Sequence, residues 1–248
     1  MRLIVLGASA AYARLGGACS GYLIEEGDTR LLLDCGTGVV NNLFNWLDPC
    51  KLNAMVISHL HPDHFLDIYP LRFYYQFDAT VPNFSLRVFA PSGASEFLGS
   101  ILSDNSKEKF TDIFRFEDID DKIKYKFNDF ELGFSKVKHC EPTFAVVVNG
   151  TKKLVYSSDT GYFDGLIQLV SGADAFICEA TLQETHAGAP VDHLTAKQAA
   201  TVAKEAGVKK LFLTHIWPGY DKQISLKEAR EVFDGEIIIL KENKFYEI

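Results

Sequence analysis

The sequence predicts an α/β protein in which sheets lie inside and helices outside. Expected strands outnumber expected helices, and each half of the chain begins with strands and continues with helices. No linker rich in Pro, Gly or Ser divides the 248 residues, so we expect one domain over residues 1–248.

Composition narrows the class of protein. With 47% hydrophobic and 23% charged residues and no low-complexity segment, the chain can build a large core. No apolar run reaches the ~18 residues of a membrane span, and residues 1–7 resemble a first strand more than a signal peptide. We therefore expect a cytoplasmic protein without a membrane partner. The net charge of −8 and the absence of any Lys/Arg run disfavour general nucleic-acid binding.

The first half begins with strands and a hairpin turn at 26–28. Strands are expected at 2–7, 20–26, 29–35, 54–58 and 85–89. Helices are expected at 39–47, 64–77 and 91–103. The Gly-rich loop 7–17 lacks Gly-Lys-Ser/Thr and precedes no helix, so it is not a phosphate-binding loop. Residues 105–124 are acidic and irregular, and we expect them to form a connection.

The second half repeats this order. Strands are expected at 129–138, 143–149, 153–157, 174–178, 209–214, 236–240 and 244–247. Helices are expected at 162–170, 195–206 and 225–233, and a loop at 180–194. Thr195 is expected to N-cap the helix that follows it, which would fix the end of this loop.

The hexapeptide His-Leu-His-Pro-Asp-His at 59–64 is the densest cluster of metal-binding side chains. It follows directly on the strand at 54–58, and four of its six residues can bind a cation: His59, His61, Asp63 and His64. One turn of backbone could place all four around two adjacent ions.

Other polar residues stand just after expected strands. His139, Asp159 and His215 each follow a strand, and Asp34 ends one. Residues at the carboxyl ends of strands meet at one edge of an α/β sheet, where such folds build their sites. Each residue alone is commonly structural, but together with the hexapeptide they can surround two ions with a bridging Asp.

These residues, in this order, resemble the metallo-β-lactamase fold superfamily over essentially the whole chain. The resemblance implies a four-layer αββα sandwich and two metal ions, expected to be Zn²⁺ with Mn²⁺ or Fe as alternatives. One ion would be held by His59, His61, His139 and Asp159. The other would be held by Asp63, His64, His215 and the shared Asp159.

Three further segments are similar to the ribonuclease Z branch: 178–181 (Cys-Glu-Ala-Thr), 192–195 (Asp-His-Leu-Thr) and 213–215 (Leu-Thr-His). The resemblance implies that Glu179 and His193 act near the metals. His193 would protonate the leaving group and Glu179 would orient it. Asp63 would also orient the attacking water, and Asp34 is a candidate partner of a ligand. We expect His186 to be an ordinary loop residue.

The chain also departs from ribonuclease Z. Only 20 positions separate His139 from Asp159, which leaves no room for the arm that grips tRNA in bacterial forms. Residues 216–220 read Ile-Trp-Pro-Gly-Tyr in place of a Ser-x-Arg-Tyr-like stretch. Trp217 and Tyr220 are equally consistent with a substrate mouth and with packing.

The predicted function is therefore a metal-dependent phosphodiesterase, short and without an arm, that acts on a small phosphodiester such as a cyclic nucleotide. RNA is disfavoured as a partner by the acidic charge and the missing arm, and a homodimer is suggested by resemblance alone. The alternatives are a tRNA 3′-processing endoribonuclease, a thioester or lactam hydrolase, which the Glu179/His193 pair disfavours, and a non-catalytic metal-binding protein.

The five cysteines (19, 35, 50, 140 and 178) are odd in number and contain no Cys-x-x-Cys, which argues against a disulfide framework or a zinc knuckle. Cys140 directly follows His139. On a strand, neighbouring side chains point to opposite faces, so the two are not expected to share a metal.

Overall fold

Two seven-stranded mixed sheets face each other in the computed structural model, which describes residues 1–78, 80–81, 84–140 and 142–248. The first sheet has the order β14-β1-β2-β3-β4-β5-β6 and the second β13-β12-β11-β10-β9-β8-β7. Each sheet has three antiparallel and three parallel pairings: the antiparallel ones come first in the order given for the first sheet and last in that given for the second, so each half of the fold contains a set of parallel strands.

The strands of the first sheet are β1 (Arg2–Gly7), β2 (Gly21–Glu26), β3 (Thr29–Leu33), β4 (Ala54–Val56), β5 (Leu86–Ala90), β6 (Phe114–Asp118) and β14 (Lys244–Glu247). Those of the second are β7 (Tyr125–Phe127), β8 (Phe130–Lys136), β9 (Phe144–Asn149), β10 (Lys153–Tyr156), β11 (Ala175–Glu179), β12 (Lys210–Thr214) and β13 (Glu236–Ile239).

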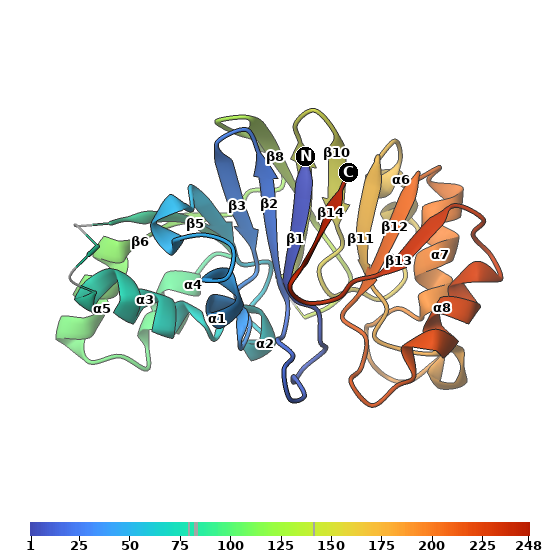
Figure 1. Ribbon diagram of the computed structural model, residues 1–248, viewed down its shortest axis with the longest axis horizontal. Coiled ribbons are helices and arrows are strands. Elements are labelled where there is room, and N and C mark those ends of the chain that lie inside the picture. Colours follow the sequence, from blue (N-terminus) through green and yellow to red (C-terminus); the bar gives the residue numbers. More distant parts are fainter. Residues whose placement is uncertain (79, 82–83, 141) are drawn as a thin grey trace.

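Helices cover the outer face of each sheet (Figure 1). On the first sheet lie α1 (Val39–Leu43), the 3₁₀ turn η1 (Pro49–Lys51), α2 (Pro62–Phe65), α3 (Ile68–Phe77), α4 (Ala94–Gly99) and α5 (Asp104–Ile113). The second half carries α6 (Gly165–Val170), the 3₁₀ turn η2 (Glu184–His186), α7 (Ala196–Glu205) and α8 (Lys222–Arg230). The predicted αββα sandwich is thereby confirmed.

Strand alternation explains why the sandwich has three apolar layers. In β1, Leu3 and Val5 point into the layer between the sheets, whereas Ile4 points toward the helices. In β11, Ile177 lies in the central layer and Phe176 faces α7. Both faces of each sheet are therefore buried, which is typical of sheets covered by helices and explains the nearly continuous apolar strands.

Several predicted boundaries were wrong. Residues 105–124, expected to be irregular, contain most of α5, all of β6 and the approach to β7. The charged sequence hides α5, whose buried side chains are only Phe110 and Ile113. The helix expected at 64–77 is broken between α2 and α3, because the backbone there bonds elsewhere. Cys35 N–H donates to His64 O at 2.7 Å, and Asp67 N–H donates to Cys35 O at 3.0 Å.

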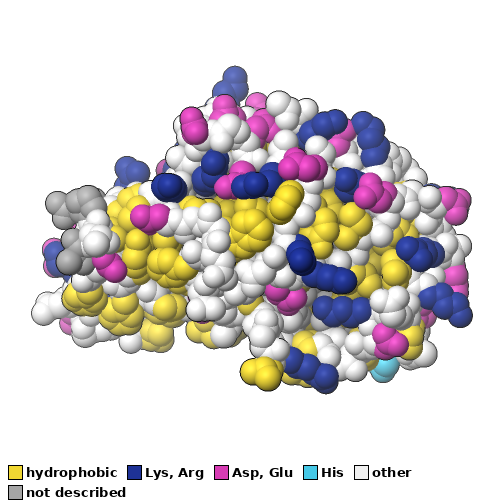
Figure 2. Space-filling model, viewed as in Figure 1, with side chains coloured by type: hydrophobic (Ala, Val, Ile, Leu, Met, Phe, Trp, Pro, Cys, Tyr) yellow, Lys and Arg dark blue, Asp and Glu magenta, His cyan; other side chains and the backbone are white. Residues whose placement is uncertain are grey.

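The surface is mixed in character. On the face shown in Figure 2, basic, acidic and hydrophobic side chains are interspersed. None of the described helices is long and apolar enough to cross a membrane.

Candidate metal centre

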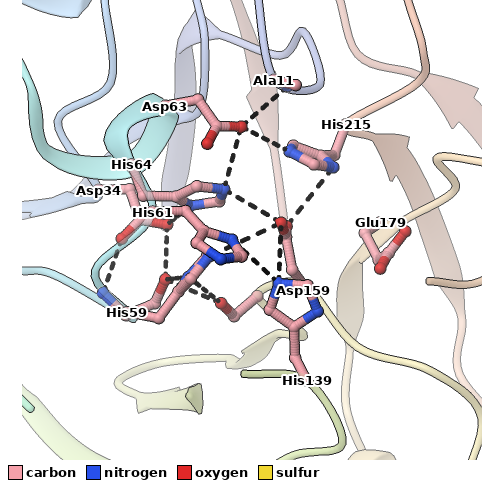
Figure 3. Close-up of polar contacts among 12 residues, drawn as sticks. Ala11, Asp34, His59, His61, Asp63, His64, His139, Asp159, Glu179 and His215 are labelled. Carbon is pink, nitrogen blue, oxygen red and sulfur yellow. Dashed lines mark hydrogen bonds and ion pairs between the residues drawn. The ribbon is translucent and has the colours of Figure 1, made fainter. Parts of the chain in front are cut away.

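The predicted site residues converge at one edge of the sandwich, where the parallel strands end (Figure 3). The first sheet supplies the hexapeptide after β4, and Asp34 after β3. The second supplies the residues that follow or end β8, β10, β11 and β12, and one from the loop before α7: His139, Asp159, Glu179, His215 and His193. The site therefore spans both sheets, and no single half contains it.

One cluster combines the hexapeptide with the loop after β8. His139 Nε2 lies 3.1 Å from His61 Nδ1, and ligand atoms of His59, His61, His139 and Cys140 all lie within 4.8 Å of one another. The expectation that the side chains of His139 and Cys140 would point to opposite faces was therefore wrong. Strand β8 ends at Lys136, so strand alternation does not apply to these two residues.

A second cluster contains Asp63, His64 and His215. Asp63 Oδ2 lies 3.2 Å from His215 Nε2 and 3.7 Å from His64 Nε2. The same oxygen accepts a 2.8 Å hydrogen bond from the backbone N–H of Ala11, in the loop after β1. Ala11 was not predicted from the sequence, because almost every residue has a backbone N–H and its role as a donor cannot be recognised from the residue type.

Asp159 lies between the two clusters. Its Oδ2 is 3.3 Å from His64 Nε2, 3.8 Å from His59 Nε2 and 3.9 Å from His139 Nε2. Its Oδ1 is 3.5 Å from His215 Nδ1. One carboxylate thus contacts imidazoles of both clusters, as a bridging ligand would.

A network around Asp34 orients the hexapeptide. Asp34 Oδ2 accepts hydrogen bonds from His64 Nδ1 and Tyr156 Oη at 2.7 Å and from Ser58 Oγ at 2.9 Å. Because Ser58 gives its proton to Asp34, its oxygen accepts from His59 Nδ1 at 3.1 Å. Both imidazoles therefore turn Nδ1 toward this network and Nε2 toward the centre.

A matching network lies on the second sheet. Buried Glu179 accepts from His193 Nδ1 at 2.7 Å and from Thr181 Oγ1 at 2.7 Å. Since the Thr181 hydroxyl donates to Glu179, it accepts from His215 Nδ1 at 2.8 Å. His139 Nδ1 donates to the backbone oxygen of Asp192 at 3.0 Å. The remaining nitrogens of His139 and His215, both Nε2, face His61 Nδ1 at 3.1 Å and Asp63 Oδ2 at 3.2 Å.

This arrangement fits a bound cation. His59 Nε2, His64 Nε2 and Asp159 Oδ1 are buried polar atoms without a hydrogen-bond partner among the described residues. Imidazole lone pairs and carboxylate oxygens are both acceptors. Burying them close together is unfavourable unless a positive charge lies between them. Imidazole and carboxylate are also the ligand types that Zn²⁺, Mn²⁺ and Fe bind.

The pKa values of the buried groups also indicate that positive charge is favoured at this site. Burial lowers the pKa of His64, but the carboxylates of Asp159 and Asp34 outweigh it and raise that pKa well above its usual value. Burial would raise the pKa of Asp159, yet the imidazoles of His215 and His64 hold it well below its usual value. Burial and the nearby His64 lower the pKa of His59, which keeps its nitrogen unprotonated.

Outside the two clusters, His193 has a different environment. Burial lowers its pKa, but the charge of Glu179 and the hydrogen bond to it are stronger and raise the pKa to about 9. The ring of His193 also lies beside those of His139 and His215, with centroids 4.9 and 5.7 Å apart. An imidazole that carries a proton therefore stands next to both clusters.

The backbone at the site is strained. Among the described residues, six other than glycine have positive φ, and four of them lie at this edge: Ala11 (49°), Asp34 (59°), Ser158 (55°) and His215 (52°). The left-handed region is unfavourable for residues with a Cβ, and such residues cluster at functional sites. Their positions accordingly agree with a functional role for this edge.

The remaining predicted residues, Trp217, Tyr220 and Thr195, make local contacts. Trp217 packs edge-on against Tyr12, with ring centroids 5.5 Å apart and partial exposure of both. Tyr220 stacks on His186 at 5.0 Å. Thr195 caps α7 in a capping box with Gln198, as predicted.

Comparison with known proteins agrees with this geometry. Residues 29–216 match the model of the beta-lactamase superfamily domain. A probable metallo-hydrolase of Bacillus subtilis, YhfI, is 31% identical over 264 residues, which cover 100% of this chain and 100% of the relative. The crystal structure of YhfI, a metallo-beta-lactamase fold protein, has a TM-score of 0.90 at 28% identity and covers 99% of this chain and 98% of its own.

Ribonuclease Z relatives are more distant. Ribonuclease Z of Haloferax volcanii is 24% identical over 303 residues, covering 100% of this chain and 95% of the relative. The short form of human tRNase Z has a TM-score of 0.80 at 22% identity and covers 100% of this chain and 99% of its own, which shows a shared fold. The resemblance predicted from the residues is confirmed.

Proposed function

The chain belongs to the beta-lactamase superfamily as a metallo-hydrolase with ribonuclease Z-like relatives, and on that premise we propose that it is a binuclear phosphodiesterase acting on a small phosphodiester such as a cyclic nucleotide. The observation that carries this proposal is the 2.7 Å hydrogen bond between His193 and Glu179, beside the two ligand clusters. This bond holds an imidazole that can donate a proton where a leaving group would form.

The proposed ligands divide between two cations. His59, His61, His139 and Asp159 would hold one. Asp63, His64, His215 and Asp159 would hold the other. Divalent ions there, most simply Zn²⁺, would polarise the phosphodiester and lower the pKa of water, so that a nucleophile exists at neutral pH.

The other steps belong to side chains of the chain. His193, oriented by Glu179 through Nδ1, would donate the proton on Nε2 to the departing alkoxide. Asp63 would orient the attacking water, since Ala11 N–H and His215 already fix its carboxylate. Thr181 would keep Glu179 and His215 in register, because its hydroxyl contacts both.

The substrate class rests on size and charge. The segment between His139 and Asp159 is occupied by β9, β10 and a short turn, and an arm that could grip a large RNA would not fit in it. The net charge of −8 also opposes a polyanion. Both features support a small phosphodiester.

A second candidate function is tRNA 3′ processing, which the similarity to ribonuclease Z favours. It would require RNA to bind without the arm. The thioester or lactam alternative has no comparable support. The site suggests no role for the Glu179/His193 pair in those reactions.

The decisive experiment measures metal content together with turnover of cyclic AMP, bis(p-nitrophenyl) phosphate and a tRNA precursor. We expect two divalent ions per chain and cleavage of the two small phosphodiesters. Two bound ions without turnover of any phosphodiester would refute the proposal. Efficient cleavage of the tRNA precursor at physiological salt would replace it with the second candidate.

A further inference from the structure

The thiol of Cys140 lies in the wrong place for an ordinary surface cysteine. Its Sγ falls within 4.8 Å of the ligand nitrogens of His59, His61 and His139, although the residue itself is exposed. The other cysteines are buried or half-buried, and none of them joins a cluster of potential ligands among the described residues. The thiol of Cys140 therefore lies beside three imidazoles, on their solvent-exposed side.

The turn that carries Cys140 holds it there. Thr143 Oγ1 donates to the backbone oxygen of Cys140 at 2.5 Å and lies 3.4 Å from its Sγ. Val137 N–H donates to Thr143 O at 3.1 Å, which closes the turn between β8 and β9. The neighbouring His139 is fixed separately through Asp192. Both side chains consequently point to the same side, toward His61.

We propose that Cys140 is a sulfur ligand of the cation held by His59, His61 and His139. Ligand atoms around one zinc ion are roughly 3.5 Å apart, and those of this set lie within 4.8 Å of one another, so an exposed side chain on a turn needs only a small adjustment to join them. The sulfur binds as thiolate and its proton leaves to solvent. This inference rests on the proposed metal site but not on the proposed substrate.

The consequence is selectivity among metals. Thiolate is a soft ligand that favours Zn²⁺ and Co²⁺, whereas Mn²⁺ prefers oxygen ligands. A position in which a thiolate joins three imidazoles and the Asp159 carboxylate should therefore retain zinc against an excess of manganese. The second cluster, which has no sulfur, should discriminate less strongly between the two metals.

Cobalt(II) substitution tests the assignment, because sulfur coordination adds a charge-transfer absorption in the near ultraviolet. We expect this band in the wild-type chain and in the control Cys50→Ala, and its loss in Cys140→Ala and Cys140→Ser. We also expect Cys140→Ala to weaken Zn²⁺ binding by at least about 10-fold, as even indirect partners of a ligand do, with Mn²⁺ binding unchanged.

A second measurement needs no substitution. Saturating Zn²⁺ should slow alkylation of Cys140 by iodoacetamide, followed by peptide mass spectrometry, while the rate at Cys50 stays constant. Cobalt binding with imidazole-type visible absorption but without the sulfur band would overturn the inference and leave the phosphodiesterase proposal intact. A sulfur band without phosphodiester turnover would do the reverse, and failure to bind cobalt at all would remove both.

Discussion

The two halves of the molecule contribute to the site in different ways. The first half delivers four candidate ligands from one stretch of six residues, between β4 and α3. The second half delivers single residues from separate strand ends and loops, up to 76 positions apart between His139 and His215. Local sequence brings the candidate ligands of the first half together, whereas the order of strands in a sheet does so in the second. Substitutions in the two halves should therefore have different effects on metal binding and activity.

The largest effect is expected where the halves meet. Asp159→Asn removes charge from the carboxylate that contacts imidazoles of both clusters. We expect the chain to lose at least one of two bound ions and phosphodiesterase activity to fall to background, measured by elemental analysis and initial rates. Asp164→Asn, on the exposed surface of the same half, is the control. Full metal content and activity in Asp159→Asn would mean that the two clusters are independent.

The next effect isolates the second half. His193→Ala should lower kcat by about 10²–10⁴-fold, because it removes the proposed proton donor. Metal content should stay unchanged, since His193 bonds to Glu179 and not to the hexapeptide. His186→Ala, which removes a histidine stacked on Tyr220, should have little effect. Loss of metal in His193→Ala would instead make this residue a ligand.

In the first half, Asp34→Asn tests the supporting network. Asp34 accepts from His64, Ser58 and Tyr156, so an amide there disrupts the orientation of His64. We expect metal affinity to weaken by about 10–100-fold, as measured by competition with a chelator. If affinity is unchanged and only the midpoint of thermal unfolding falls, Asp34 supports the fold but not the ligand.

The smallest effect concerns the loop that carries His193. Thr195→Ala removes the capping hydroxyl of α7 and should reduce the free energy of unfolding by about 1 kcal/mol in urea titrations. Thr201→Ala in the same helix is the matched control, because its hydroxyl donates to the carbonyl of Lys197, within the helix itself. If both variants lose the same free energy of unfolding, the capping hydroxyl stabilises the helix no more than an ordinary threonine hydroxyl does.

These differences also explain what the sequence could predict. The hexapeptide could be identified because its four potential ligands lie within six consecutive residues, which can be recognised without any knowledge of the fold. His139, Asp159 and His215 could be proposed because each follows an apolar strand, but their pairing depended on resemblance to a family. Thr195 was predictable from local capping chemistry alone.

Other features depend on tertiary structure. Helix α5 was missed because only two of its side chains are buried, so its polar sequence resembles a loop. The direction of the Cys140 side chain was predicted wrongly because strand alternation was extended past Lys136, where β8 ends. The Ala11 N–H and the hydroxyls of Ser58 and Thr181 follow from contacts between distant segments, which residue type does not reveal.

The left-handed backbone at Ala11, Asp34, Ser158 and His215 bears on protein engineering. Each such conformation costs about 1–3 kcal/mol in a residue with a Cβ. Selection for thermal stability alone would therefore tend to relax these positions, for example by glycine at Ala11, and so loosen the carboxylate of Asp63. The turns at Asn128 and Asn243 share the same backbone conformation away from the candidate metal ligands. Because the Asn243 side chain hydrogen-bonds Asn42, glycine at Asn128 is the better way to a more stable variant whose candidate metal ligands are unaltered.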